Sequence, residues 1–145
     1  MKIKLEEWAY MPERAHAMDA GADLRTPIDF DIRPHESVTI DTGVHVELPI
    51  VTIGGEEFVT VGILKSKSGL NVNHGIITID GVVDVGYTGS VRVKLRNIGE
   101  RTHHFKAGDK ISQLVVMPIL TPDFELVDEL EETDRGEKGF GSSGR

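Results

Sequence analysis

Apolar and polar residues alternate along most of this chain. From residue 38 to residue 48 every second side chain is apolar or threonine, while the positions between carry Thr39, Asp41, His45 and Glu47. A period of two residues is typical of a strand with one buried face. The same pattern predicts strands over residues 91–96, where the alternate positions are basic, and over the shorter segments 3–5 and 58–63.

Residues 111–120 form a more continuous apolar run, which predicts a strand buried on both faces. Glycine and proline separate the runs, and no long stretch has the apolar period of 3.6 residues that a helix needs. Many short strands at close spacing favour an antiparallel sandwich or jelly roll. We therefore predict an all-β protein. Residues 49–64, which include Gly54 and Gly55, are interpreted as an extended hairpin.

The composition changes near residue 129, first to acidic residues and then to glycine and serine with one aromatic. We predict a single β core domain over residues 1–128 and a flexible C-terminal arm over residues 129–145.

Composition narrows the class of protein. The chain has no cysteine, which excludes disulfides, thiolate metal sites and a cysteine nucleophile. No apolar segment approaches the roughly 20 residues that span a bilayer, and the charged N-terminus does not resemble a signal peptide. We expect a soluble cytoplasmic protein with no membrane partner. The formal net charge of −8 argues against nucleic acid binding, but an anionic substrate remains possible if Mg²⁺ or local cations compensate.

The run GVVDVGYTG, residues 81–89, is the strongest chemical signal. It places Asp84 at the turn of an apolar hairpin, with Tyr87 three residues later. Apolar neighbours raise the cost of a carboxylate charge, so such an acid is a candidate catalytic group. A turn-forming aspartate is the alternative.

Two further segments could bind anions. The tail RGEKGFGSSG, residues 135–144, contains a G-x-G-x-x-G pattern, but no strand–helix unit surrounds it. Its glycine and serine groups could wrap phosphates while Phe140 stacks on a base, although an unstructured tail is the alternative. In the other segment we expect Ser68 and Gly69 to form a turn next to Lys65 and Lys67, which suits either an anion cradle or an ordinary polar turn. His103 and His104 are adjacent on a predicted strand and face opposite sides, so they do not suit one metal ion.

Five stretches together resemble the five motifs of the trimeric dUTP diphosphatases (dUTPases). They are DAGADL at 19–24, KSGL at 67–70, GVVDVGYTG at 81–89, GDKISQL at 108–114 and RGEKGFGSSG at 135–144. They span nearly the whole chain in the family's order. The resemblance implies a dUTPase-like jelly-roll or β-barrel fold.

The resemblance also implies an activity. Family members cleave dUTP to dUMP and diphosphate by in-line attack of water on the α-phosphorus, which keeps uracil out of DNA and supplies dUMP for dTMP synthesis. Asp84 matches the acid that activates the water, and Tyr87 matches the ring that excludes a 2′-hydroxyl. The segment 78–83 matches the element that binds uracil, and the expected contacts are Thr78, Gly81, Val82 and Val83.

Phosphate contacts and a metal follow from the same resemblance. Lys67, Ser68, Gly69 and Gln113 match phosphate-site residues, and Asp23 matches an acid that approaches Mg²⁺ through water. In the tail, the matching residues are Arg135 for the γ-phosphate, Phe140 for stacking on uracil, and Gly141, Ser142 and Ser143 for the phosphates. Family members are homotrimers whose tails cross to a neighbouring subunit.

The chain departs from the family at Lys67 and Lys110, where many members have arginine. The difference matters because lysine lacks the bidentate fork of arginine. Two alternatives stay open. One is a dCTP deaminase on the same fold, which would need a catalytic glutamate. The other is a dUTP-responsive regulatory binding protein, suggested only by the long 49–64 segment.

Overall fold

The computed structural model describes residues 1–136. This part of the chain contains eleven strands and one short helix. The elements are β1 (Lys2–Leu5), β2 (Gly21–Arg25), β3 (Phe30–Ile32), β4 (Ser37–Glu47), β5 (Val51–Ile53), β6 (Glu56–Lys65), α1 (Ser68–His74), β7 (Ile76–Thr78), β8 (Gly81–Val83), β9 (Ser90–Asn97), β10 (His103–Phe105) and β11 (Lys110–Ile119). The fold is all-β, as the alternation predicts.

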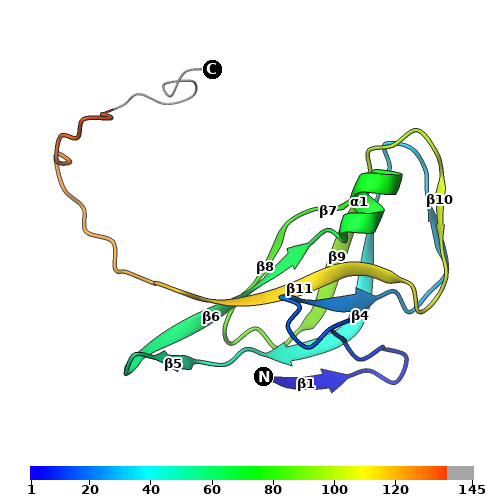
Figure 1. The fold of residues 1–145 in the computed structure, drawn as a ribbon, viewed down its shortest axis with the longest axis horizontal. Helices are drawn as coiled ribbons and strands as arrows, with labels where there is room; N and C mark the ends of the chain where they lie inside the picture. Colours follow the sequence, from blue (N-terminus) through cyan, green and yellow to red (C-terminus); the bar gives the residue numbers. More distant parts are fainter. Residues whose placement is uncertain (137–145) are drawn as a thin grey trace.

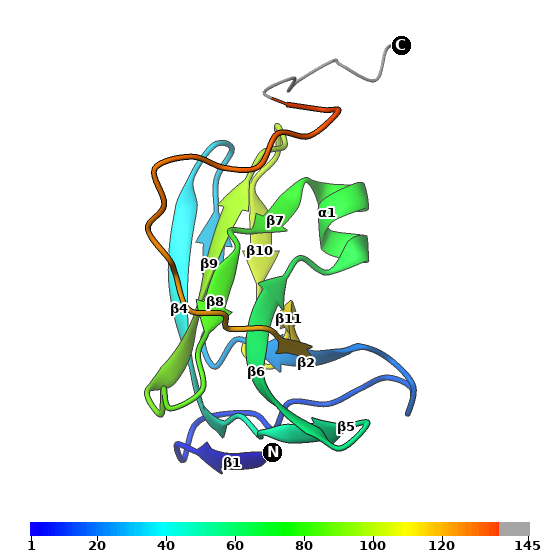
Figure 2. The ribbon, with the colours of Figure 1, turned by 90° about the vertical axis from the view of Figure 1, so that its left-hand side faces the viewer.

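The strands form two main antiparallel sheets and one small one. The first sheet has the order β1-β4-β9-β7, and the second has the order β2-β11-β6-β5 with β8 also paired to β6. The strands β10 and β3 form a separate pair. Figure 2 shows β4 and β9 beside β6 and β11, with the helix α1 at one end. Fully buried side chains from both sheets meet between them, including Leu24, Val44, Val93, Leu95 and Leu114.

The two predicted half-buried strands are confirmed. In β9, buried residues alternate strictly with exposed ones, and Val93 and Leu95 have no solvent exposure. In β4 the alternation is interrupted by a bulge between Asp41 and His45, where the pairing register with β9 shifts. Gly43 lies in this bulge with a φ of 66°. A Cβ there would lie 2.6 Å from the ring of Trp8, so only glycine fits without displacing that ring.

The prediction for residues 111–120 is wrong in its second half. The strand β11 is buried at Ile111, Ser112 and Leu114, but Met117 is 45% exposed and Pro118 is also exposed. The apolar composition of residues 111–120 therefore does not predict which of their side chains are buried within this one chain. No described element of the chain covers that end of β11 on its outer face, which leaves an apolar surface available to a partner.

The segment that follows Lys67 is a helix rather than the expected turn. The amide of Asn71 donates to the Lys67 carbonyl at 2.9 Å, and Gly75, with a φ of 66°, ends α1 by donating to Asn71. A helix of seven residues is too short for its apolar period to stand out from a turn.

The predicted hairpin over residues 49–64 is present. Its strands β5 and β6 pair antiparallel, and Gly54 and Gly55 form the turn with positive φ angles. The last strand ends at Ile119, and residues 120–136 leave the sheets as an exposed segment without helix or strand (Figure 1). That residues 129–145 close over an active site stays a prediction. Within the described part of the chain, no helix is long and apolar enough to cross a membrane.

Candidate active site

Asp84 lies on a connection between the two main sheets. The strand before it, β8, pairs with β6, whereas the strand after it, β9, pairs with β4 and β7. The predicted hairpin is therefore wrong, because alternation identifies strands but not their partners. The amide of Tyr87 donates to the Asp84 carbonyl at 3.1 Å and closes the turn.

The Asp84 carboxylate is exposed and makes no hydrogen bond or ion pair with residues 1–136. Apolar crowding was the reason to expect a costly charge, yet in the single chain Val82 and Val85 beside it are themselves 64% and 39% exposed. The turn thus presents an unpaired acid and apolar side chains to its surroundings. Such a surface suits a bound molecule or a second chain.

Tyr87 is held in a fixed orientation on the same turn. Its hydroxyl donates to the Ser90 carbonyl at 3.0 Å, and its ring remains 47% exposed. Gly89 makes room for it, because a Cβ at that position would lie 2.4 Å from the Tyr87 hydroxyl oxygen. The turn that carries Asp84 therefore also presents an exposed aromatic ring in a fixed orientation.

The segment 78–83 is anchored from behind. The amide of Thr78 donates to the Ser66 hydroxyl at 2.8 Å, and the Thr78 hydroxyl donates to Ser112 at 3.1 Å. Gly81 and Val83 then pair with Leu64 and Gly62 of β6. Of the predicted contacts, Val82 faces outward, while Thr78 and Val83 are buried and act through the backbone they fix.

Asp23 is the buried acid of a second group of predicted residues. Its residue exposure is only 5%, and its two carboxylate oxygens pair with Lys67 and, at 2.6 Å, with Lys110. Burial alone would raise the pKa of this carboxyl, but the hydrogen bonds and charges of Lys110 and Lys67 outweigh it and hold the pKa below its ordinary value. Asp23 is thus ionised, and it fixes both ammonium groups.

A hollow of about 330 Å³ opens over this group. Asp23, Lys67 and Gln113 line it together with Asp19 and Gly21. Gly21 lies against Gln113, since a Cβ on Gly21 would come within 2.3 Å of the Gln113 Oε1 atom. The structure therefore brings together three of the predicted phosphate- and metal-site residues. Lys67 and the Gln113 amide supply hydrogen-bond donors at this hollow, and such donors can bind an anionic ligand.

The donors present fit a Mg²⁺ ion that is held mainly by its ligand. Among residues 1–136, no three acidic or histidine side chains converge on a point that could hold a metal. An ionised carboxylate offers about four lone-pair sites, and the two lysines leave some of those of Asp23 for water. Asp23 could thus contact the hydration shell of a Mg²⁺ ion whose other ligands are phosphate oxygens.

Other predicted residues lie apart. Ser68 and Gly69 are exposed at the start of α1, next to Lys67 in the chain. Arg135 is exposed in the segment after the last strand. Phe140, Gly141, Ser142 and Ser143 lie outside the described residues. Within residues 1–136, no hydrogen bond or ion pair joins the Asp23 group to the turn that carries Asp84.

Sequence reasoning named Lys110 only as a departure from the family, and it did not single out Ser66 or Ser112. Lys110 and Ser112 both lie in the GDKISQL stretch, which was a visible signal. The hydroxyl of Ser66 had none, since its partner, the amide of Thr78, belongs to a different element, the strand β7. His103 is also more buried than expected: its ring packs at 4.5 Å from Phe105 and 4.8 Å from His74, and burial followed by the His74 charge lowers its pKa.

The all-β fold carries two groups of candidate residues, one at the hollow lined by Asp23, Lys67 and Gln113 and one on the turn that holds Asp84 and Tyr87, an arrangement that suits an enzyme. A model of the dUTPase family matches residues 7–144, so the chain belongs to the dUTPase family. The predicted family, fold class and enzyme class are thereby confirmed.

Individual relatives agree. The chain is 41% identical over 137 residues to the deoxyuridine 5′-triphosphate nucleotidohydrolase of Cutibacterium acnes, covering 92% of this chain and 85% of the relative. It superimposes on the Staphylococcus bacteriophage 80alpha dUTPase solved with dUpNHpp with a TM-score of 0.86 at 32% identity, covering 99% and 98% of the two chains. A mutant dUTPase of phage phi11, described as coordinating a structural Mg(II) ion, matches with a TM-score of 0.77 at 30% identity over 90% and 98%.

Proposed function

We propose that this protein hydrolyses dUTP to dUMP and diphosphate by in-line attack of a water molecule on the α-phosphorus. The observation that carries the proposal is the turn between β8 and β9, which holds both the exposed Asp84 carboxylate and the fixed ring of Tyr87. Family membership supports it, as does the dUpNHpp bound in the 80alpha enzyme.

In this reaction Asp84 holds the water and accepts its proton. Its contribution comes mainly from positioning the water for attack. The water donates its proton to the carboxylate as its oxygen bonds to the α-phosphorus. The bond between the α-phosphorus and the oxygen that bridges it to the β-phosphorus breaks, and diphosphate leaves. Tyr87 packs under the deoxyribose, where a 2′-hydroxyl would collide with its ring.

The segment 78–83 binds the uracil edge through its backbone. Thr78, Gly81, Val82 and Val83 lie along it, and the hydrogen bonds from Thr78 to Ser66 and Ser112 keep it rigid. A rigid backbone leaves no space for the 5-methyl group of thymine. Steric exclusion of a larger base, such as thymine, discriminates between two bases more strongly than an apolar pocket that must reject the smaller of two groups.

The hollow over Asp23 receives the phosphates. Lys67 supplies a cation and Gln113 an amide, with Ser68 and Gly69 beside them. From the tail we assign Arg135 to the γ-phosphate, Phe140 to uracil stacking, and Gly141, Ser142 and Ser143 to the phosphates. Mg²⁺, when bound, neutralises triphosphate charge and polarises the phosphoryl oxygens. Asp23 orients its water shell.

We also propose a homotrimer in which neighbouring subunits complete each site. In its support, the Asp84 turn and the Asp23 hollow have no hydrogen bond to one another within residues 1–136, and each alone is an incomplete site. Exposed apolar side chains on and after β11, such as Met117 and Leu120, provide contact surface. A solution mass of three 15.9 kDa chains is expected, and a monomer at working concentration would contradict the assembly.

The physiological role that we assign is to keep uracil out of DNA and to supply dUMP for dTMP synthesis. The cytoplasmic location expected from the sequence stays a prediction.

The test is diphosphate release from each deoxynucleoside triphosphate, with Mg²⁺ present and then chelated. We expect dUTP to be the preferred substrate and chelation to lower the rate. Ammonia release from dCTP would instead support the deaminase alternative. Absence of dUTP turnover would contradict the proposed function.

A further inference from the structure

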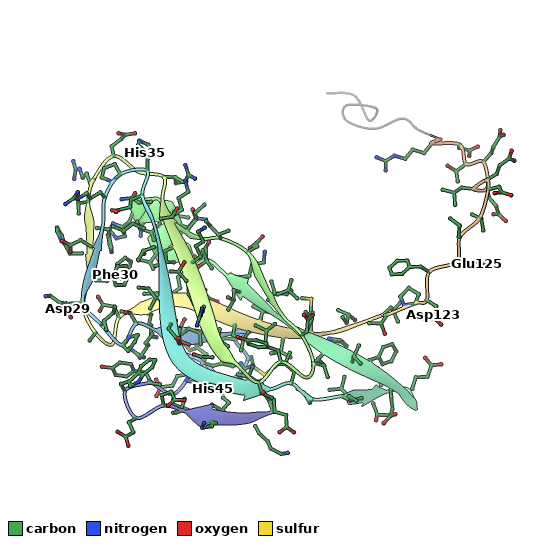
Figure 3. The ribbon with its side chains drawn as sticks, turned by 180° about the vertical axis from the view of Figure 1, so that it is seen from behind. Asp29, Phe30, His35, His45, Asp123 and Glu125 are labelled. Atoms are coloured by element: carbon green, nitrogen blue, oxygen red, sulfur yellow. The ribbon has the colours of Figure 1, made fainter. Side chains whose placement is uncertain are left out.

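His45 lies on β4 and contacts the turn that carries Asp84 and Tyr87. Its Nδ1 atom is 2.8 Å from the carbonyl oxygen of Thr88, the residue that follows Tyr87. Its Nε2 atom is 3.0 Å from Oε1 of Glu6, and the imidazole is only 20% exposed. Figure 3 shows His45 at the end of β4 that lies beside β1.

Both partners of this imidazole accept hydrogen bonds. A backbone carbonyl has no proton to give, and an ionised carboxylate has none either. A neutral imidazole carries one N–H, so it could satisfy only one of the two contacts. Both hydrogen bonds can therefore form only if the His45–Glu6 pair carries one proton more than a neutral imidazole and an ionised carboxylate carry together.

The bulge in β4 sets this geometry. The Glu6 amide donates to the Gly43 carbonyl at 3.0 Å, which brings the Glu6 side chain to His45. On the opposite side His45 pairs with Ser90 across the strands, and the Ser90 hydroxyl donates to Asp41, the residue before the bulge. Two side chains of β4 thus hold the chain just after Tyr87.

We propose that His45 is a positioning residue, which together with Glu6 clamps the Thr88 carbonyl and so fixes the turn that carries Asp84 and Tyr87. This inference rests on the proposed function of those two residues. Loss of the clamp removes none of the site's own groups, but it frees the turn that carries them to move. Displacement of a reacting group by about 1 Å can cost on the order of a hundredfold in rate.

Several charges face the imidazole. Lys4 of β1 lies opposite His45, and its Nζ is 3.8 Å from Glu6, so it competes for that carboxylate. Asp41 on β4 favours a positive imidazole; its pKa is lowered mainly by the Ser90 hydroxyl and also by Arg92 of β9. Glu47 of β4 is paired with Lys2 of β1.

Four single variants separate the contacts. In H45N the amide nitrogen takes the place of Nδ1 and keeps the bond to Thr88, whereas H45Q places its amide near Nε2 and loses that bond. In E6Q the new amide can donate to Nε2 of a neutral imidazole, so both contacts persist without the extra proton. The matched control is H104Q, which breaks another exposed histidine–carboxylate pair, that of His104 with Asp31 at 2.6 Å, away from the turn.

We expect kcat for dUTP to fall by about tenfold or more in H45Q, with a smaller change in KM, and to fall less in H45N. H104Q should match the wild type. E6Q should stay closer to the wild type than H45Q does, because its amide preserves both contacts of the imidazole. Amide hydrogen exchange over residues 85–89 should be faster in H45Q than in H45N.

Wild-type kinetics and unchanged exchange in H45Q would overturn the inference, as would an equal loss of activity in H104Q. The exchange measurement needs no substrate. If the wild-type chain fails to hydrolyse dUTP, the proposed function fails, while the exchange result still decides whether His45 holds the turn.

Discussion

The hydroxyl of Thr78 donates to the hydroxyl of Ser112 across 3.1 Å, and this bond joins β7 to β11. Both residues are buried, with exposures of 5% and 0%. Ser112 in turn donates to the Lys65 carbonyl at 3.0 Å. The strand β7, which leads into the segment 78–83 that we propose binds uracil, is thus fixed from β6 and β11 at once, and the backbone there has little freedom to move.

Replacement of Ser112 should cost more stability than replacement of Thr78. S112A leaves the Thr78 hydroxyl without its acceptor and removes the bond to the Lys65 carbonyl, so we expect a loss of about 1–3 kcal/mol. T78V removes one donor while Ser112 keeps its bond to Lys65, so its cost should be smaller. Urea unfolding measures both, with exposed Ser37 changed to alanine as the control. Equal stability of S112A and the control would contradict this role of the network.

Asp23 makes stability depend on acid pH. Because its pKa is lowered in the folded protein, the ionised carboxyl contributes stability above its ordinary value near about 4, and the contribution is lost as the pH falls toward the folded pKa. D23N should therefore be less stable than the wild type near neutral pH, and the difference should shrink in acid. Breaking a buried ion pair typically costs about 3–5 kcal/mol of stability. Because both lysines are partly exposed to water, the loss of stability in D23N should lie at or below the lower end of that range.

Unfolding at several pH values checks this expectation. The control is D29N, which breaks the exposed pair of Asp29 with Lys106 and should lose less stability. A difference between D23N and the wild type that stays constant down to acid pH would show that Asp23 does not act through its charge.

Gly89 and Tyr87 together should set the preference for deoxyribose. In G89A the new Cβ would lie 2.4 Å from the Tyr87 hydroxyl, so the ring must move. We expect the preference for dUTP over UTP to fall by about tenfold in G89A and further in Y87A. Y87F loses the bond to Ser90 but keeps the ring, so it should keep most of the preference. The ratio of kcat/KM for dUTP and UTP measures it, and full selectivity in Y87A would remove Tyr87 from this role.

Alternation along the chain predicted β1, β4, β6 and β9, but it did not predict short strands such as β2, β3, β7 and β10, nor which strands pair. Val93 and Leu95 are buried as their spacing requires, because one sheet face is enough to impose that pattern. The turn at Asp84 was misread as a hairpin because the choice between β4 and β8 as a neighbour of β9 depends on contacts distant in sequence. The half-exposed end of β11 was misread because an apolar run has the same composition whether its side chains are buried in the core of the chain or exposed on its surface.

The candidate site was likewise predictable from the sequence only in part. Motifs pointed to Asp23, Lys67 and Gln113, and the structure brings these together at one hollow. They did not indicate that Lys110 shares the carboxylate of Asp23, nor that His45 reaches the Thr88 carbonyl. Those contacts arise from sheet register and from the bulge at Gly43, which no local pattern encodes.

The most direct measurement follows the reacting water. Wild type and D84N are incubated with dUTP in water labelled with heavy oxygen, and both products are analysed by mass spectrometry, while dUpNHpp binding is measured in parallel. We predict that the label enters dUMP and not diphosphate, and that D84N binds the analogue but barely turns over. Label in the diphosphate, or undiminished turnover by D84N, would contradict an attack on the α-phosphorus by a water that Asp84 activates.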